Sequence, residues 1–118
     1  NEANLIVEAI SAAEAMVLNQ QPGYQLIDLR EPQELIEKGA IPGALNCPRG
    51  VLEFCADPDS EDAHPEFQTA GTLILFCAGG LRSALAARTL QEMGHDNIKH
   101  ISGGYAAWLD AGGSFYYR

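Results

Sequence analysis

Residues 72–83 read TLILFCAGGLRS, an apolar run followed by a glycine-containing turn and a polar start to the next segment. The apolar run at 72–76 follows Gly71 and is typical of a central strand that is covered on both faces. Residues 82–93 have helical apolar spacing, and Gly94 suits the end of a helix. On its apolar side we expect Leu85, Ala86, Leu90 and Met93. The stretch therefore predicts a strand, a loop that begins at Cys77, and a helix.

The rest of the chain repeats this alternation of strand and helix. We expect a helix at 4–19 with Asn4 as its N-cap, a strand at 24–29, a helix at 31–38 that ends at Gly39, a surface stretch of short helices and loop at 48–70, a strand at 98–101, and a helix at 105–111 after Gly103 and Gly104. This order predicts an α/β domain with a mainly parallel sheet. Sites in such sheets lie at the carboxyl ends of the strands, which directs attention to residues 76–83.

Length and charge set outer limits on function. The chain has 118 residues, which predicts a single domain over 1–118, with 47% apolar and 19% charged residues. The formal net charge of −9 argues against nucleic acid and anionic lipid as partners. No apolar run approaches the roughly 20 residues of a membrane span, and the N-terminus shows no signal-peptide pattern. The chain begins with Asn1 rather than Met, so a removed leader would be invisible here.

Three cysteines are too few for a disulfide framework. Cys47, Cys55 and Cys77 form no CxxC pair, and the three histidines are not at zinc-ligand spacing from them. We therefore expect no metal, reduced thiols and a cytoplasmic location, with a periplasmic one open if a leader was removed. His64, His95 and His100 need no function on this view.

The loop after the strand has the composition of an anion-binding nest. Gly79 and Gly80 allow successive backbone N–H groups to converge on one point, and a helix that begins near Arg82 adds its positive end. Both effects favour a thiolate, so we expect the pKa of Cys77 to fall below the value of about 8.5 for a free cysteine. The alternative is that Cys77 is a small buried hydrophobic side chain.

Four segments stand out within residues 24–112: Ile27-Asp28-Leu29-Arg30-Glu31, residues 39–46 (GAIPGALN), residues 77–83 and residues 103–108 (GGYAAW). In composition and order they resemble the matching segments of the single-domain rhodanese family of sulfurtransferases. The resemblance implies a parallel five-stranded sheet with helices on both faces and a persulfide on Cys77. One departure is Ala40, where the family often carries His, and this bears on local packing.

The resemblance also implies roles for the site residues. Cys77 would take the outer sulfur of a small anionic donor such as thiosulfate and pass it to cyanide, a thiol or a protein, without a cofactor or metal. We expect the donor or the transferred sulfur to be held by Ala78, Gly79, Gly80, Leu81, Arg82 and Ser83. Arg82 would contact the donor unless a carboxylate holds it, and Ser83 would cap the helix or bind the loop. Asp28 and Arg30 would shape the site rather than react.

Several alternatives remain open. Cysteine phosphatases of similar fold have five residues between Cys and Arg, whereas this loop has four, which favours a sulfur atom over a phosphate. The domain could instead be a non-catalytic or regulatory binding module, or a redox thiol sensor that pairs Cys77 with Cys47 or Cys55. Otherwise Cys47 and Cys55 are bystander thiols. Trp108 is expected in the core, and the oligomeric state would be monomer or weak homodimer, with residues 115–117 (FYY) as a tail, a packed edge or an interface.

Overall fold

The computed structural model describes residues 8–79, 81–95 and 97–117. In chain order the elements are β1 (Glu8–Ile10), α1 (Ala12–Asn19), β2 (Tyr24–Asp28), α2 (Pro32–Lys38), β3 (Leu45–Asn46), the 3₁₀ helix η2 (Arg49–Val51), α3 (Leu52–Ala56), α4 (Glu66–Thr69), β4 (Thr72–Phe76), α5 (Leu81–Glu92), β5 (Ile98–Ile101) and α6 (Gly104–Asp110). Within these residues, no helix is both long and apolar enough to cross a membrane.

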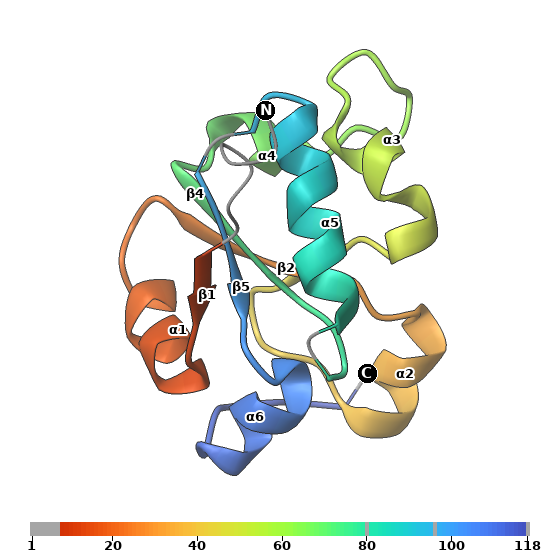
Figure 1. Ribbon diagram of the computed structural model, residues 1–118. Helices are drawn as coiled ribbons and strands as arrows, with labels where there is room; N and C mark the ends of the chain where they lie inside the picture. Colours follow the sequence, from red (N-terminus) through yellow and green to blue (C-terminus); the bar gives the residue numbers. More distant parts are fainter. Residues whose placement is uncertain (1–7, 80, 96, 118) are drawn as a thin grey trace.

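The five strands form one sheet in the order β1-β5-β4-β2-β3, and every neighbouring pair is parallel. The apolar run predicted as a central strand is β4, in the middle of the sheet. Asp28 at the end of β2 is level with Phe76 on one side and Asn46 on the other. The carboxyl ends of β2, β3 and β4 therefore lie side by side, which confirms the predicted parallel α/β architecture (Figure 1).

Helices cover both faces of this sheet. On one face α3, α4 and α5 pack over alternate strand residues, and this core cluster includes Ile27, Leu29, Leu75, Cys77 and Leu90. On the other face α1 and α6 pack over the intervening residues, in a cluster that includes Leu26, Ile74, Phe76, Ile101 and Trp108. The prediction that Trp108 is a core residue is confirmed, and its Nε1 donates a hydrogen bond to the carbonyl of Ser114 at 2.9 Å.

The N-terminal helix is shorter than the sequence pattern predicts. The expected helix at 4–19 is wrong at its start, because Glu8–Ile10 pairs with β5 as an edge strand. Ser11 then caps α1 in a reciprocal capping box with Glu14, which starts the helix at Ala12. Asn4, the expected N-cap, lies outside the described residues. A three-residue strand is too short for its alternation to stand out from helical spacing.

Two expectations about burial also need correction. Residues 48–70 are not all surface, because Leu52, Cys55, Ala56 and Phe67 are buried under the sheet. On α5, Ala86 and Leu90 are buried as expected, but Leu85 is 65% exposed, and Met93, which follows the last residue of α5, is 40% exposed. Ala87 takes their place on the buried face, since small side chains let the helix approach β4 and β5 closely.

Two leucines of α5 provide a matched test of this packing. Leu90→Ala removes a fully buried side chain, so we expect the free energy of unfolding to fall by about 2–5 kcal/mol. Leu85→Ala removes an exposed side chain from the same helix, and a change within about 0.5 kcal/mol is expected. Urea unfolding of both variants measures the difference. Equal losses would mean that the α5 face is assigned wrongly.

Candidate functional site

Cys77 lies directly after the central strand, at the carboxyl edge of the sheet. Its side chain is 1% exposed and belongs to the core cluster beneath α5. Ala78 and Gly79 are exposed, and α5 begins at Leu81. Gly80 and the side chain of Leu81 lie outside the described residues, so the convergence of backbone N–H groups in this loop remains a prediction.

The first turn of α6 holds the beginning of the Cys77 loop. The backbone N–H of Tyr105 donates to the Cys77 carbonyl at 2.7 Å, and that of Ala106 donates to the Ala78 carbonyl at 3.2 Å. Gly104 allows this approach, because its φ is +60° and a Cβ there would overlap the Cys77 carbonyl oxygen. The two carbonyls therefore face α6 (Figure 1, where α6 lies at the end of the sheet at which β4 leads into α5).

Asp28 and Arg30 form a buried ion pair at the end of β2. Their side chains are each 1% exposed and lie 2.7 Å apart, from Nη2 to Oδ2. Arg30 also donates from Nε to Oδ1 of Asp28 at 3.0 Å, and its backbone N–H donates to the same oxygen at 2.9 Å. Each charge is therefore paired within the fold, and the site-shaping role of the two residues stays a prediction.

The same arginine links β2 to two further parts of the chain. Its Nη2 donates to the carbonyl of Gly39 at 3.0 Å, and its guanidinium lies 3.9 Å from the centre of the Tyr105 ring. The Tyr105 hydroxyl donates to the carbonyl of Lys38 at 2.9 Å. Burial raises the pKa of Tyr105, and the positive charge of Arg30 opposes that shift. Arg30 thus connects β2, the end of α2 and the helix that supports Cys77.

Arg82 has a carboxylate neighbour that the motif does not reveal. Its Nη2 lies 3.7 Å from Oε2 of Glu34 on α2, and the Arg82 side chain is 43% exposed. The other oxygen of Glu34, Oε1, accepts the backbone N–H of Glu31 at 3.0 Å in the capping box of α2. The carboxylate is therefore fixed beside Arg82, which agrees with the alternative weighed for that arginine, although a 3.7 Å pair leaves it able to meet a ligand.

Ser83 is buried behind the loop and contacts the neighbouring strand. Its Oγ lies 3.2 Å from Nδ1 of His100 on β5. Burial lowers the pKa of His100 from its ordinary value of 6.5. A neutral ring with its proton on Nε2 accepts the Ser83 hydroxyl at Nδ1. The sequence assigned no role to His100, and only the pairing of β4 with β5 brings it to this position.

Cys47 and Cys55 form a disulfide, so the expectation that they are reduced bystander thiols is wrong. Cys47 follows β3, and α3 returns across the same face of the sheet to place the two α-carbons 6.7 Å apart. A spacing of eight residues does not reveal this return of the chain. The disulfide pairs these two cysteines with each other and not with Cys77, contrary to the sensor that would pair Cys77 with either of them.

The C-terminal segment forms a packed edge at Ala40. The backbone N–H of Ala40 donates to the Tyr116 carbonyl at 2.7 Å, and the backbone N–H of Tyr116 donates to the Ala40 carbonyl at 2.8 Å. Ala40 is 3% exposed, so the position where the resemblance leads one to expect histidine is a small buried side chain here. Phe115, Tyr116 and Tyr117 keep partly exposed rings.

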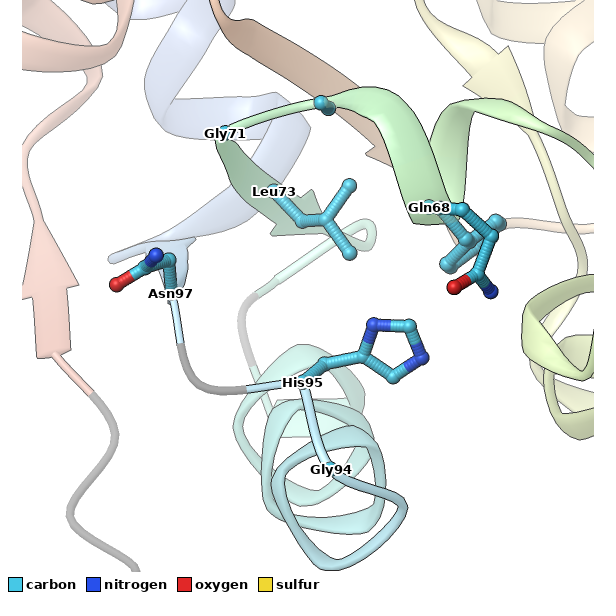
Figure 2. A pocket seen from close by; sticks show the side chains of 8 residues that line it. Gln68, Gly71, Leu73, Gly94, His95 and Asn97 are labelled. Atoms are coloured by element: carbon cyan, nitrogen blue, oxygen red, sulfur yellow. The ribbon is translucent and has the colours of Figure 1, made fainter.

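A separate cleft lies at the other end of the strands, next to the amino end of β4. It has a volume of about 300 Å³ and is lined by Phe67, Gln68, Ala70, Gly71, Leu73, Gly94, His95 and Asn97. Figure 2 shows the His95 side chain directed toward Gln68, whereas Asn97 points the other way. Gly71 and Leu73 mark the amino end of β4, so the cleft is remote from Cys77. Among the described residues, no three His, Cys, Asp or Glu side chains are grouped to hold a metal ion.

A family model and several known proteins are similar to most of this chain. The family model of the rhodanese-like domain matches residues 11–111. Thiosulfate sulfurtransferase 16, chloroplastic, of Arabidopsis thaliana is 34% identical over 94 residues, which cover 76% of this chain and 78% of the relative. The tRNA uridine(34) hydroxylase of Xanthomonas oryzae pv. oryzae is 33% identical over 92 residues, which cover 77% of this chain but 35% of that enzyme.

A solved structure from Rhodopseudomonas palustris CGA009, described as a protein of unknown function and possible tyrosine phosphatase, is also similar. It is 45% identical, with a TM-score of 0.89, and the match covers 98% of this chain and 89% of that one.

The burial of His100 predicts a dependence of stability on pH. The folded-state pKa of His100 lies below 6.5, so the unfolded chain binds the proton more readily. His100 therefore contributes stability that is complete above about pH 6.5 and is lost as the pH falls toward the folded-state pKa. In urea unfolding between about pH 7.5 and 5.5, the stability difference between wild type and His100→Gln should shrink as the pH falls. His64→Gln is the control, and parallel curves for wild type and His100→Gln would contradict the assignment.

Proposed function

Because the chain belongs to the rhodanese-like domain family, we propose that it is a sulfurtransferase that carries a sulfane sulfur as a persulfide on Cys77. The single observation behind this proposal is the position of Cys77, at the carboxyl end of the central parallel strand, with four residues between it and Arg82 in the first turn of α5. Similarity to a relative named as a thiosulfate sulfurtransferase supports the reaction class.

The proposed reaction has two displacement steps. The Cys77 thiolate attacks the outer sulfur of a donor such as thiosulfate, the S–S bond of the donor breaks, and sulfite leaves with the electron pair. A thiolate or cyanide then attacks the outer sulfur of the persulfide, and Cys77 leaves as the thiolate. The acceptor in a cell would be a thiol, either small or carried by a protein.

The surrounding residues would position rather than react. The N–H groups of Tyr105 and Ala106 bind the carbonyls of Cys77 and Ala78, which keeps these two oxygens occupied on the α6 side. Backbone N–H groups of residues 78–82 and the start of α5 would then face the anionic sulfur. Arg82 would contact the negatively charged donor, with Ser83 anchoring the first turn of the helix to His100.

Phosphate ester hydrolysis is the second candidate, because a similar structure is described as a possible tyrosine phosphatase. Only four residues lie between Cys77 and Arg82, whereas cysteine phosphatases of similar fold have five. The shorter loop encloses less space than a tetrahedral phosphate needs, which argues against phosphatase activity. A phosphatase also needs an acid that protonates the leaving group. Turnover of p-nitrophenyl phosphate by the wild type and not by Cys77→Ser would favour this second candidate.

Intact-mass measurement tests the first step directly. After full reduction and removal of the reductant, incubation with thiosulfate should add one sulfur atom to the wild-type chain. Cyanide should remove that sulfur and yield thiocyanate. Cys77→Ser should gain no sulfur and lose sulfur transfer by several orders of magnitude, because the nucleophile is absent. A wild-type protein that is confirmed as reduced and folded but gains no mass would exclude the proposal and favour a binding module.

The ion pair of Arg82 predicts a change in donor binding. Glu34→Gln keeps the capping interaction of α2 but removes the negative charge 3.7 Å from Arg82. A partly exposed pair of this kind is worth up to about 1 kcal/mol, so the KM for thiosulfate should fall by up to about fivefold with kcat little changed. Steady-state kinetics measures both values.

Glu37→Gln is the matched control for that variant. Glu37 lies on the exposed side of the same helix and bonds to Gln33 at 3.0 Å, so its substitution makes the same charge change away from Arg82. An equal fall in KM for both variants would mean that overall charge is responsible. A rise in KM for Glu34→Gln would mean that Glu34 instead holds Arg82 in its binding position.

A further inference from the structure

The disulfide lies at the same edge of the sheet as the proposed nucleophile. Cys47 follows β3, and its backbone N–H donates to the Asp28 carbonyl at 2.8 Å. Leu29 follows β2, and its N–H donates to the Phe76 carbonyl at 2.9 Å, directly before Cys77. Cys47, Leu29 and Cys77 therefore form a row across three neighbouring strands, and all three side chains belong to the core cluster beneath α5.

This row keeps Cys77 too far from Cys47 for the two to form a disulfide. Two strand spacings place the α-carbons of Cys47 and Cys77 about 10 Å apart, beyond the roughly 7 Å that a disulfide spans. Cys47 and Cys55 instead have α-carbons 6.7 Å apart. The arrangement keeps the disulfide close to the nucleophile while preventing direct exchange with it.

We propose that Cys47 and Cys55 are a reversible redox site whose state sets the rate of sulfur transfer at Cys77. The effect on rate rests on the proposed function, whereas the redox site itself does not. Cys47 and Cys55 are 0% and 4% exposed and lie among apolar side chains such as Leu52 and Phe67. Such an environment accepts two thiols as readily as a disulfide, because a buried thiol behaves as a small hydrophobic group.

The segment that carries Cys55 is short and has one exposed side. The helix α3 has five residues, Leu52–Ala56, of which Leu52, Cys55 and Ala56 are buried, whereas Phe54 is 58% exposed. Local opening of one short helix requires less free energy than unfolding of the whole domain. Opening of α3 gives a reductant access to Cys55, the slightly more exposed of the two cysteines.

The reduction is a thiol–disulfide exchange with a dithiol, either a small molecule or a protein. A thiolate of the dithiol attacks the Cys55 sulfur, the Cys47–Cys55 bond breaks, and Cys47 leaves as a thiolate that takes up a proton. The second thiol of the reductant then attacks the mixed disulfide, releases the Cys55 thiol and becomes the oxidised disulfide. Two electrons and two protons pass to the protein, and a disulfide oxidant reverses the reaction.

The effect on Cys77 passes through Arg49. Its backbone N–H donates to the Leu29 carbonyl at 3.1 Å, and its Nη2 donates to Thr89 of α5 at 3.4 Å. The disulfide fixes the chain on both sides of Arg49 and so holds this link between β2 and the helix that begins in the Cys77 loop. Reduction releases the link, and we expect sulfur loading of Cys77 to become several-fold slower because its loop is less well ordered.

Alkylation and mass measurement test the redox site first. The full chain is equilibrated in buffers of graded ratio of reduced to oxidised dithiothreitol, the exchange is quenched with acid, and free thiols are alkylated in denaturant. We expect one labelled cysteine in oxidising buffers and three in reducing buffers, with a reversible midpoint between them. Cys77→Ser should show the same midpoint with one label fewer at each extreme, which does not depend on sulfur transfer. A disulfide that resists excess dithiol in the folded protein, or three thiols under all conditions, would refute the site.

Single-turnover loading tests the coupling. Oxidised and reduced proteins, freed of small thiols, are mixed with thiosulfate, and the added sulfur is followed by intact mass. The reduced protein should load several-fold more slowly, and Cys47→Ala/Cys55→Ala should load at one rate whatever its prior treatment. Equal rates for oxidised and reduced wild type would refute the coupling. Failure of all proteins to load would instead refute the proposed function, while the alkylation result would still stand.

Discussion

The buried ion pair of Asp28 and Arg30 is the constraint on which the arrangement at the carboxyl end of the sheet depends. Two charges with 1% exposed side chains are costly to bury unless each is fully bonded. The Asp28 carboxylate accepts hydrogen bonds from Nε, Nη2 and the backbone N–H of Arg30, and Nη2 of Arg30 also donates to the Gly39 carbonyl. The pair therefore requires β2 to end, α2 to finish and α6 to pack at one place.

The position of Cys77, the proposed nucleophile, follows from that convergence. Tyr105 lies with its ring against Arg30 and its hydroxyl on Lys38, so its backbone N–H is fixed where it binds the Cys77 carbonyl. Gly104 has no side chain to prevent the approach. The chemistry proposed for Cys77 thus depends on backbone groups whose places are determined by a charge pair one strand away, and local loop sequence alone does not determine them.

The sequence predicted those strands, loops and helices whose residue pattern is local. The run at 72–76, the loop at Cys77 and the strand at 98–101 were found because apolar composition and glycine mark them directly, and the parallel order of the sheet followed from alternation. The missed features all involve partners distant in sequence or on a returning chain. They include β1 on β5, Glu34 beside Arg82, His100 behind Ser83, and the return of α3 that joins Cys47 to Cys55.

The net charge of −9 describes the whole chain and does not determine how strongly an anion is attracted near Cys77. A charged surface at distances beyond about 10 Å is largely screened at 0.1 M salt, so it affects how fast an anion arrives more than how tightly it binds. Within that distance, Arg82 is offset by Glu34 and Arg30 is neutralised by Asp28. In the proposed reaction, attraction for an anionic sulfur would then come chiefly from backbone N–H groups and the start of α5, and its strength would depend on their alignment rather than on formal charge. If the site works in this way, the contacts of α6 with the Cys77 loop and of α2 with Arg82 would matter more to it than the number of basic residues.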